Sequence, residues 1–219
     1  MKKVTDSKVR AIEYLLGDGL LPRGFKSGPL GLYRSAGDRV DSLTTIHGKY
    51  PGEDRATLTV TVSVGFKSFA RFMKDAPPYG LGVFHATRPM LHGCNLGTLD
   101  PAVRAMKEWP VTPETSVTTL GRRVLHDIEV FALPFFEDFP TIEKVVAAWA
   151  GNATRASREA LLTAAVHWFQ GDRDKARDFA DARIRELTPL VKDLGGDPRF
   201  TWTCFMQYLE SKGLEKRRQ

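Results

Sequence analysis

Cysteine and long apolar segments are both scarce in this sequence. Its 219 residues include only two cysteines, Cys94 and Cys204, whereas small secreted domains usually carry a regular set of cysteines that form disulfides. The N-terminal lysines run directly into polar residues, without the apolar core of a signal peptide. The longest apolar stretches, 131–136 and 145–150, are too short to span a bilayer. These absences predict a cytoplasmic protein with no membrane segment.

The sequence signatures of several enzyme and nucleotide-binding classes are missing as well. No Gly-x-Ser-x-Gly motif accompanies His126-Asp127, and neighbours on a helix do not face each other. The spaced glycines in 24–31 are not followed by Gly-Lys-Ser or Gly-Lys-Thr, so they do not form a phosphate-binding loop. A nucleophilic Cys94 or Cys204 would need a histidine brought close by the fold. We identify no catalytic centre from the sequence.

One group of residues has side chains that bind metals in other proteins. His85, His92 and Cys94 lie close in sequence, and the His-x-Cys spacing places two of them on one face of a strand. The spacing from His85 to His92 matches no standard zinc motif, and no second cysteine or nearby carboxylate completes the set. We therefore predict no metal and no other cofactor, and keep these three residues as weak candidates.

The positive charge of the chain lies at its two ends. The formal net charge is +6, but residues 1–39 carry +4, residues 212–219 carry +3, and residues 40–211 carry −1. Binding to nucleic acid draws its affinity from basic groups that neutralise successive phosphates along one face. The neutral body argues against a nucleic-acid partner, although binding through the basic ends remains an alternative.

The N-terminal two thirds of the chain show the patterns of a helix followed by strands. Val9, Ile12, Leu16 and Leu20 recur at helical spacing after a capping Asp6 or Ser7, and Gly17 and Gly19 predict the end of that helix. Period-two alternation then predicts an antiparallel hairpin. The expected extended segments are 40–49 and 56–64 around a turn at 50–54, then 81–86, 92–99 and 109–111.

The second strand of this hairpin alternates apolar residues with hydroxyl-bearing ones. Leu58, Val60, Val62 and Val64 would face the core, as in a sheet with one buried and one solvated face. The opposite face would then be an exposed, hydroxyl-rich surface able to recruit a partner protein. This candidate binding face consists of Thr57, Thr59, Thr61 and Ser63.

From about residue 115 the apolar spacing becomes helical. Leu120, Val124, Ile128 and Phe131 mark one long helix, which Pro134 should kink or end. Gly151-Asn152 is the best boundary, which gives an α+β domain over 1–150 and a helical appendage over 151–219. Helices expected near 155–170, 173–190 and 200–213 form a C-terminal helical hairpin extension. The predicted fold class is α+β, an antiparallel sheet packed against helices.

Several local motifs together resemble an uncharacterised bacterial family, the domain of unknown function family 4304. They cover about residues 5–150 and departures occur at His47-Gly48 and in the segment 66–89. The resemblance implies an antiparallel sheet packed on helices, no established activity and no transferable site residues. The motifs are the leading helix, Leu21-Pro22-Arg23-Gly24-Phe25-Lys26, Tyr33-Arg34, Gly37-Asp38, a strand near 44–48, the strand 58–64 ending in Val64-Gly65, Trp109, Leu133-Pro134-Phe135-Phe136 and Trp149.

Three functional hypotheses follow from these patterns. The first is a non-catalytic protein-binding or interaction module, of the kind that immunity proteins represent, because catalytic motifs are missing and the body is neutral. The second is a small hydrolase whose site assembles only in three dimensions, which would require titratable groups converging in a cleft. The third is nucleic-acid binding through the basic termini.

Overall fold

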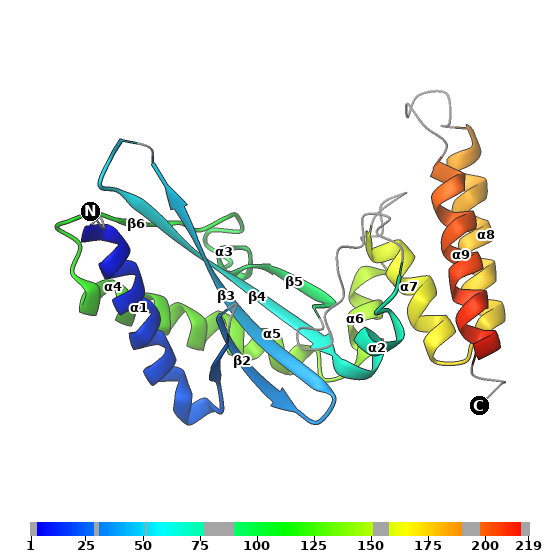
Figure 1. Cartoon of the computed structure of the whole chain (residues 1–219), viewed down its shortest axis with the longest axis horizontal. Helices are drawn as coiled ribbons and strands as arrows, with labels where there is room; N and C mark the ends of the chain where they lie inside the picture. The colour runs from blue at the N-terminus through cyan, green and yellow to red at the C-terminus, as the bar shows by residue number, and fades with distance from the viewer. Residues whose placement is uncertain are drawn as a thin grey trace. The chain divides into compact units, whose positions relative to one another are not determined.

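The computed structural model describes residues 4–28, 31–50, 52–76, 90–150, 158–189 and 198–215. The chain divides into two compact units. We call residues 1–66 with 90–140 the sheet unit, and residues 67–89 with 141–219 the helical unit. The fold is α+β, with a six-stranded antiparallel sheet and helices (Figure 1), and the predicted fold class is confirmed.

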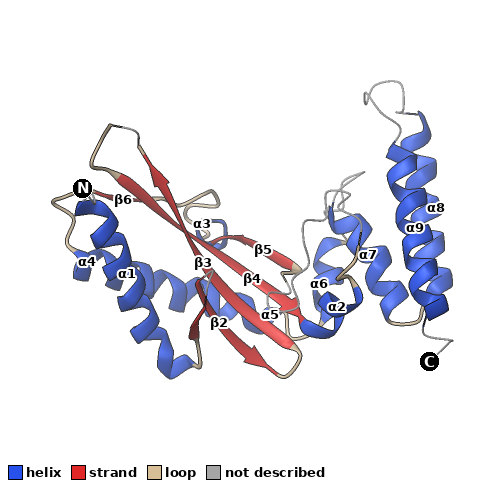
Figure 2. Ribbon diagram, in the orientation of Figure 1, coloured by secondary structure: helices blue, strands red, loops and turns tan. Residues whose placement is uncertain are grey.

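The sheet is built from consecutive antiparallel neighbours (red in Figure 2). Its strands follow the order β1-β2-β3-β4-β5, and β6 pairs with the opposite end of β4 from β5. The predicted segment 81–86 falls outside the described residues. The strands are β1 (Lys26–Gly28), β2 (Gly31–Ala36), β3 (Arg39–Lys49), β4 (Ala56–Phe66), β5 (His92–Asn95) and β6 (Trp109–Val111).

The hairpin β3–β4 is the longest pairing and confirms the alternation seen in the sequence. Its register runs from Arg39 opposite Phe66 to Lys49 opposite Ala56. Gly52, in the connecting turn, has a φ of 84°, a left-handed conformation that glycine adopts without a Cβ clash. Val60, Val62 and Val64 are fully buried. They share the face of the sheet that its helices cover.

Helices α1 and α4 lie against each other, and α1 and α5 lie on that face of the sheet. Thr45 and His47, which share a face with Val60, both contact Glu13 of α1, and this places α1 there. Phe135 stacks with His92 from the same face. The helices of the sheet unit are α1 (Val4–Leu20), the 3₁₀ turn η1 (Leu21–Arg23), α3 (Leu96–Leu99), α4 (Val117–Asp127), the π-helical turn η2 (Ile128–Ala132) and α5 (Leu133–Asp138).

Three local expectations need correction. The first helix does not end at Gly17 or Gly19 but continues to Leu20, and the left-handed glycine is Gly24, after η1. Pro134 does not end its helix, because the wider π-helical turn η2 directly precedes it and the helix continues to Asp138. The segment 92–99 is a strand only to Asn95, whose side chain accepts a hydrogen bond from the Gly97 amide and so starts α3.

The helical unit packs around α7. This helix is apolar on nearly all sides, and residues 160–166 are all buried, as expected for a helix at the centre of a bundle. Its last residue, Phe169, lies 5.6 Å from Phe69 and 5.4 Å from Phe72 between ring centroids. The helices are α2 (Lys67–Phe72), α6 (Ile142–Trp149), α7 (Arg158–Phe169), α8 (Arg173–Leu187) and α9 (Pro198–Glu215).

The C-terminal helices α7, α8 and α9 pack together, and the α7–α8 hairpin turns at Gly171 with φ of 91°, as the sequence predicts. The two compact units differ from the predicted division at residue 150. Helix α6 belongs with the C-terminal helices, and so does α2, because Phe69 and Phe72 pack on Phe169. Within the described ranges, no helix is long and apolar enough to cross a bilayer.

Candidate functional site

The hydroxyl-rich face of β4 is less accessible than the sequence suggests. Thr57, Thr59 and Ser63 are 7%, 8% and 1% exposed, and Thr61 is half-buried. The Thr59 hydroxyl donates to the backbone carbonyl of Ile46 on β3. The prediction of an exposed binding face at Thr57, Thr59, Thr61 and Ser63 is therefore wrong in its premise, because short side chains on a strand paired on both sides are shielded by their neighbours.

The weak metal candidates do not form a site among the described residues. His92 and Cys94 share one face of β5, as expected, but the His92 ring packs against Phe135 and Phe139 at 5.6 and 4.8 Å. Burial raises the pKa of the Cys94 thiol, which disfavours the thiolate that binds zinc or attacks a substrate. His85 lies outside the described residues. In the part of the chain that is described, no three metal-binding side chains converge.

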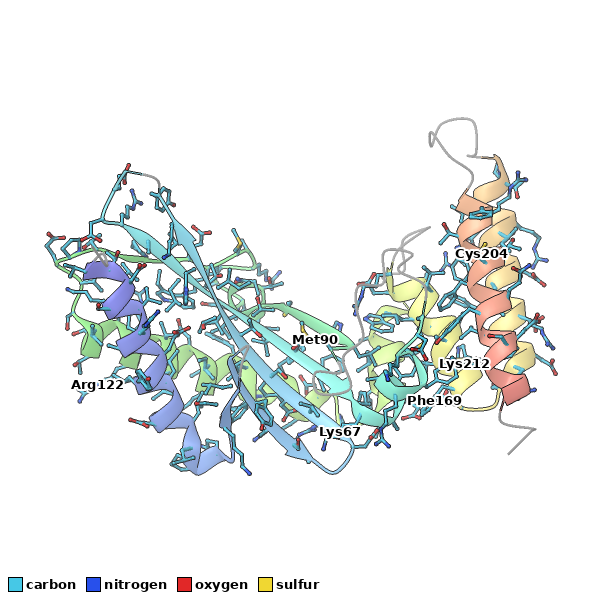
Figure 3. All side chains as sticks on the ribbon, in the orientation of Figure 1. Lys67, Met90, Arg122, Phe169, Cys204 and Lys212 are labelled. Atoms are coloured by element: carbon cyan, nitrogen blue, oxygen red, sulfur yellow. The ribbon has the colours of Figure 1, made fainter. Side chains whose placement is uncertain are left out.

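The other residues singled out by sequence have structural surroundings. Asp127 is buried and lies 2.7 Å from the Lys107 Nζ, while the neighbouring His126 is exposed. Cys204 and Lys212 both lie on α9 (labelled in Figure 3). Cys204 is half-buried, and Lys212 pairs with Asp75 at 3.2 Å. The rest of the basic tail, 213–219, lies outside the side chains that the structure describes.

The sheet unit contains a cleft between α1 (dark blue in Figure 1) and the strands β1, β2 and β3. Its volume is about 330 Å³, at the lower end of the range of about 300 to 1,000 Å³ typical of small-ligand sites. The floor is apolar and is formed by side chains that are 2% exposed or less: Leu16, Phe25, Leu43, Val60 and Ile128. Such a floor favours an apolar group over a charged one.

The mouth of the cleft combines charged residues with exposed apolar ones. Tyr14 is 76% exposed and Leu21 is 65% exposed, although both side chains are large and apolar over most of their surface. The charged residues at the mouth are Arg10, Glu13, Asp18 and Lys26. Exposed apolar side chains at the rim of an apolar hollow are typical of a surface that binds a ligand or a partner molecule.

Glycines keep the cleft open, and Gly17 is the most informative of them. A Cβ at Gly17 would meet only Ser27 Oγ at 3.6 Å and Leu32 Cδ2 at 3.7 Å, which are ordinary contact distances. A Cβ at Gly19 would lie 2.5 Å from Leu125 Cδ2, so the packing of α1 on α4 explains that glycine. Packing gives no such reason for Gly17, which lines the cleft and leaves it wider.

This difference predicts unequal effects of two alanine substitutions on the free energy of unfolding. Both Gly17→Ala and Gly19→Ala should gain about 0.5 to 1 kcal/mol from helix propensity. Only Gly19→Ala must displace the end of the Leu125 side chain, at an overpacking cost of about 1 kcal/mol. We expect Gly17→Ala to raise the free energy of unfolding in urea and Gly19→Ala to lie about 1 kcal/mol below it. Equal stability of the two variants would contradict this account.

A second, smaller hollow of about 140 Å³ lies further toward the start of α1. It is lined by Asp6, Val9, Arg10, His47, Lys49 and Ala56, so Arg10 lines both hollows. The acids near Arg10 already have partners. Glu13 accepts a hydrogen bond from the Thr45 hydroxyl and lies 3.0 Å from His47 Nε2, and Asp6 lies 3.0 Å from Lys49 Nζ.

Arg10 itself has no hydrogen bond or ion pair within the described part of the chain. It is exposed on α1, one turn before Glu13. Sequence reasoning missed this cleft and Arg10. One signal was available: Gly17 interrupts an amphipathic helix at a position where alanine would be more favourable, and a glycine inside a helix often has a packing or functional reason.

A buried cluster of charged residues lies on the face of the sheet that the helices cover. Asp41 is 1% exposed, and its carboxylate lies 2.6 Å from Arg34 Nε and 3.0 Å from Arg39 Nε. Burial raises the pKa of Asp41, and the hydrogen bond from Arg34 and the charge of Arg39 oppose that rise. The Arg34 guanidinium also covers the rings of Phe25 and Phe136, at 5.1 and 5.7 Å from their centroids. This cluster joins β2, β3 and α5, and we interpret it as structural.

Fold and cleft together define an α+β protein with an apolar ligand-sized cleft between its first helix and its sheet. Comparisons with family models, curated proteins and solved structures find no match for this chain. The described residues around the cleft are therefore the basis of any functional statement.

Proposed function

We propose that this protein is a non-catalytic binding protein that holds a small, largely apolar ligand in the cleft between α1 and the sheet. The single observation that carries the proposal is the 330 Å³ cleft with a buried apolar floor, kept wide by Gly17. Burying a ligand on such a floor would stabilise the complex by roughly 25 cal/mol per Å² of apolar area removed from water.

The sequence suggests a non-catalytic module that binds a partner protein, and the proposal keeps a non-catalytic binding role but replaces the partner protein with a small apolar ligand. The hypothesis of an interaction module placed its partner on the hydroxyl face of β4, which is largely buried. The cleft offers apolar area and an exposed apolar rim instead. The hydrolase alternative requires titratable groups converging in a cleft, and at this cleft the acids and bases lie at the rim over an apolar floor. The resemblance to the domain of unknown function family 4304 stays a hypothesis.

Binding of the uncharged fluorescent probe N-phenyl-1-naphthylamine tests the proposal. We expect the wild-type protein to bind the probe with saturable enhancement of its fluorescence, because the probe enters the apolar floor. The Gly17→Leu variant places a side chain in the same space, and we expect its affinity to fall at least tenfold.

The matched control is Ala147→Leu, which adds the same side chain at an exposed position of α6. This control should bind the probe as the wild type does. Circular dichroism and the thermal unfolding midpoint establish that both variants are folded. Unchanged binding in a folded Gly17→Leu variant, or no saturable binding by the wild type, would refute the proposal.

A further inference from the structure

We infer that the ligand of the cleft is a small amphiphile with a single anionic head group, which Arg10 binds in the second hollow. This inference rests on the proposed function, and it adds the chemical class of the ligand. Its basis is the position of Arg10 between an apolar cleft of about 330 Å³ and a polar hollow of about 140 Å³.

The side chains around Arg10 contact one another and leave its guanidinium without a hydrogen-bond partner. Asp6 is paired with Lys49, and Glu13 accepts from Thr45 and contacts His47. Arg10 has neither a hydrogen bond nor an ion pair with any described residue. An anion beside it would therefore meet a free guanidinium, which forms strong charge-assisted hydrogen bonds to carboxylates, sulfonates and phosphates.

The other end of the cleft offers no such position between two hollows. Asp18 and Lys26 line this end with opposite charges, and neither of them lines the polar hollow. Asp18 follows Arg10 by eight residues of α1, which corresponds to about 12 Å along the helix axis at 1.5 Å per residue. An anionic head is thus favoured at the Arg10 end, and the apolar part of the ligand extends along the floor toward Gly17.

Two naphthylamine probes separate the head group from the apolar part. 1-Anilinonaphthalene-8-sulfonate has the same ring system as N-phenyl-1-naphthylamine and adds one sulfonate. We expect the wild type to bind the sulfonate at least tenfold more tightly than the uncharged probe. In Arg10→Gln this preference should disappear, because the affinity for the sulfonate falls more than the affinity for the uncharged probe.

Arg122→Gln is the matched control. Arg122 lies on α4, is exposed, and lines neither hollow (labelled in Figure 3), so its substitution removes the same charge from the same unit. This control should keep the preference for the sulfonate. The preference of the wild type should also fall as salt rises from 50 to 500 mM, because salt screens an exposed ion pair.

Each outcome decides the inference. Equal affinity of the wild type for the two probes, or an unchanged preference in Arg10→Gln, would overturn the anionic head group while the proposed function stands. Absence of binding of both probes would overturn both. Displacement of the uncharged probe by decanoate more strongly than by decanol would support the inference with a natural head group. Displacement by phosphatidylglycerol vesicles as well would assign that head group to a lipid, and displacement by decanoate alone would assign it to a free amphiphile.

Discussion

Asp41→Ala should lower the free energy of unfolding by about 3 to 5 kcal/mol, the cost of breaking a buried ion pair by removing one partner. The substitution leaves Arg34 and Arg39 without the carboxylate that lies 2.6 and 3.0 Å from their Nε atoms. The Arg34 guanidinium would remain over the rings of Phe25 and Phe136, in surroundings that solvate a charge poorly. Urea unfolding followed by circular dichroism measures the loss.

Asp138→Ala is the control for this substitution. Asp138 is exposed at the end of α5, and removal of its carboxylate should change the free energy of unfolding by about 0.5 kcal/mol or less. If Asp41→Ala were as stable as Asp138→Ala, the remaining contacts of the two arginines with Glu137 and the Phe136 carbonyl would suffice, and the buried carboxylate would not stabilise the cluster.

Trp202→Ala should have an effect of similar size in the helical unit, about 3 to 5 kcal/mol. Trp202 on α9 is 1% exposed, and its ring lies 6.2 Å from that of Phe179 on α8. Its removal opens a cavity between the C-terminal helices that neighbouring side chains fill only in part. The free energy of unfolding in urea is again the measurement.

Phe200→Ala provides the comparison on the same helix. Phe200 precedes Trp202 by two residues but is 67% exposed, so truncation of its side chain should change stability by about 0.5 kcal/mol or less. A loss below about 1 kcal/mol for Trp202→Ala, or an equal loss for the two variants, would contradict the packing of α9 on its neighbours.

The hairpin of β3 and β4 followed directly from the sequence, whereas β1 and β2 were not predicted. Residues 56–66 alternate apolar and hydroxyl side chains, and the turn at 50–54 contains Pro-Gly, so pairing of the two flanking strands was the arrangement that buried the valines. The sequence did not determine how exposed the hydroxyl-bearing face of β4 is. Alternation fixes which side chains share a face, but how far that face is shielded depends on strands distant in sequence.

The same limit applies to glycines and to proline. Gly17 and Gly19 look alike in sequence, and only the position of Leu125 on α4 distinguishes a glycine required by packing from one that lines a cleft. Pro134 predicted a kink or the end of a helix, because a missing amide breaks the regular hydrogen bonding. The π-helical turn before it accommodates the break. In each case the residue has the conformational preference expected of its type. A contact or a backbone geometry elsewhere in the fold decides what that preference means for the helix.

By itself the sequence determined the fold class, the hairpin, the C-terminal helices and the missing catalytic motifs, because periodicity and turn chemistry act over a few residues. The tertiary structure alone decided the cleft, the position of Arg10 beside two hollows, and the membership of α2 in the helical unit. These features depend on segments that are distant in sequence and close in space. Residue patterns along the chain do not show which distant segments lie close together.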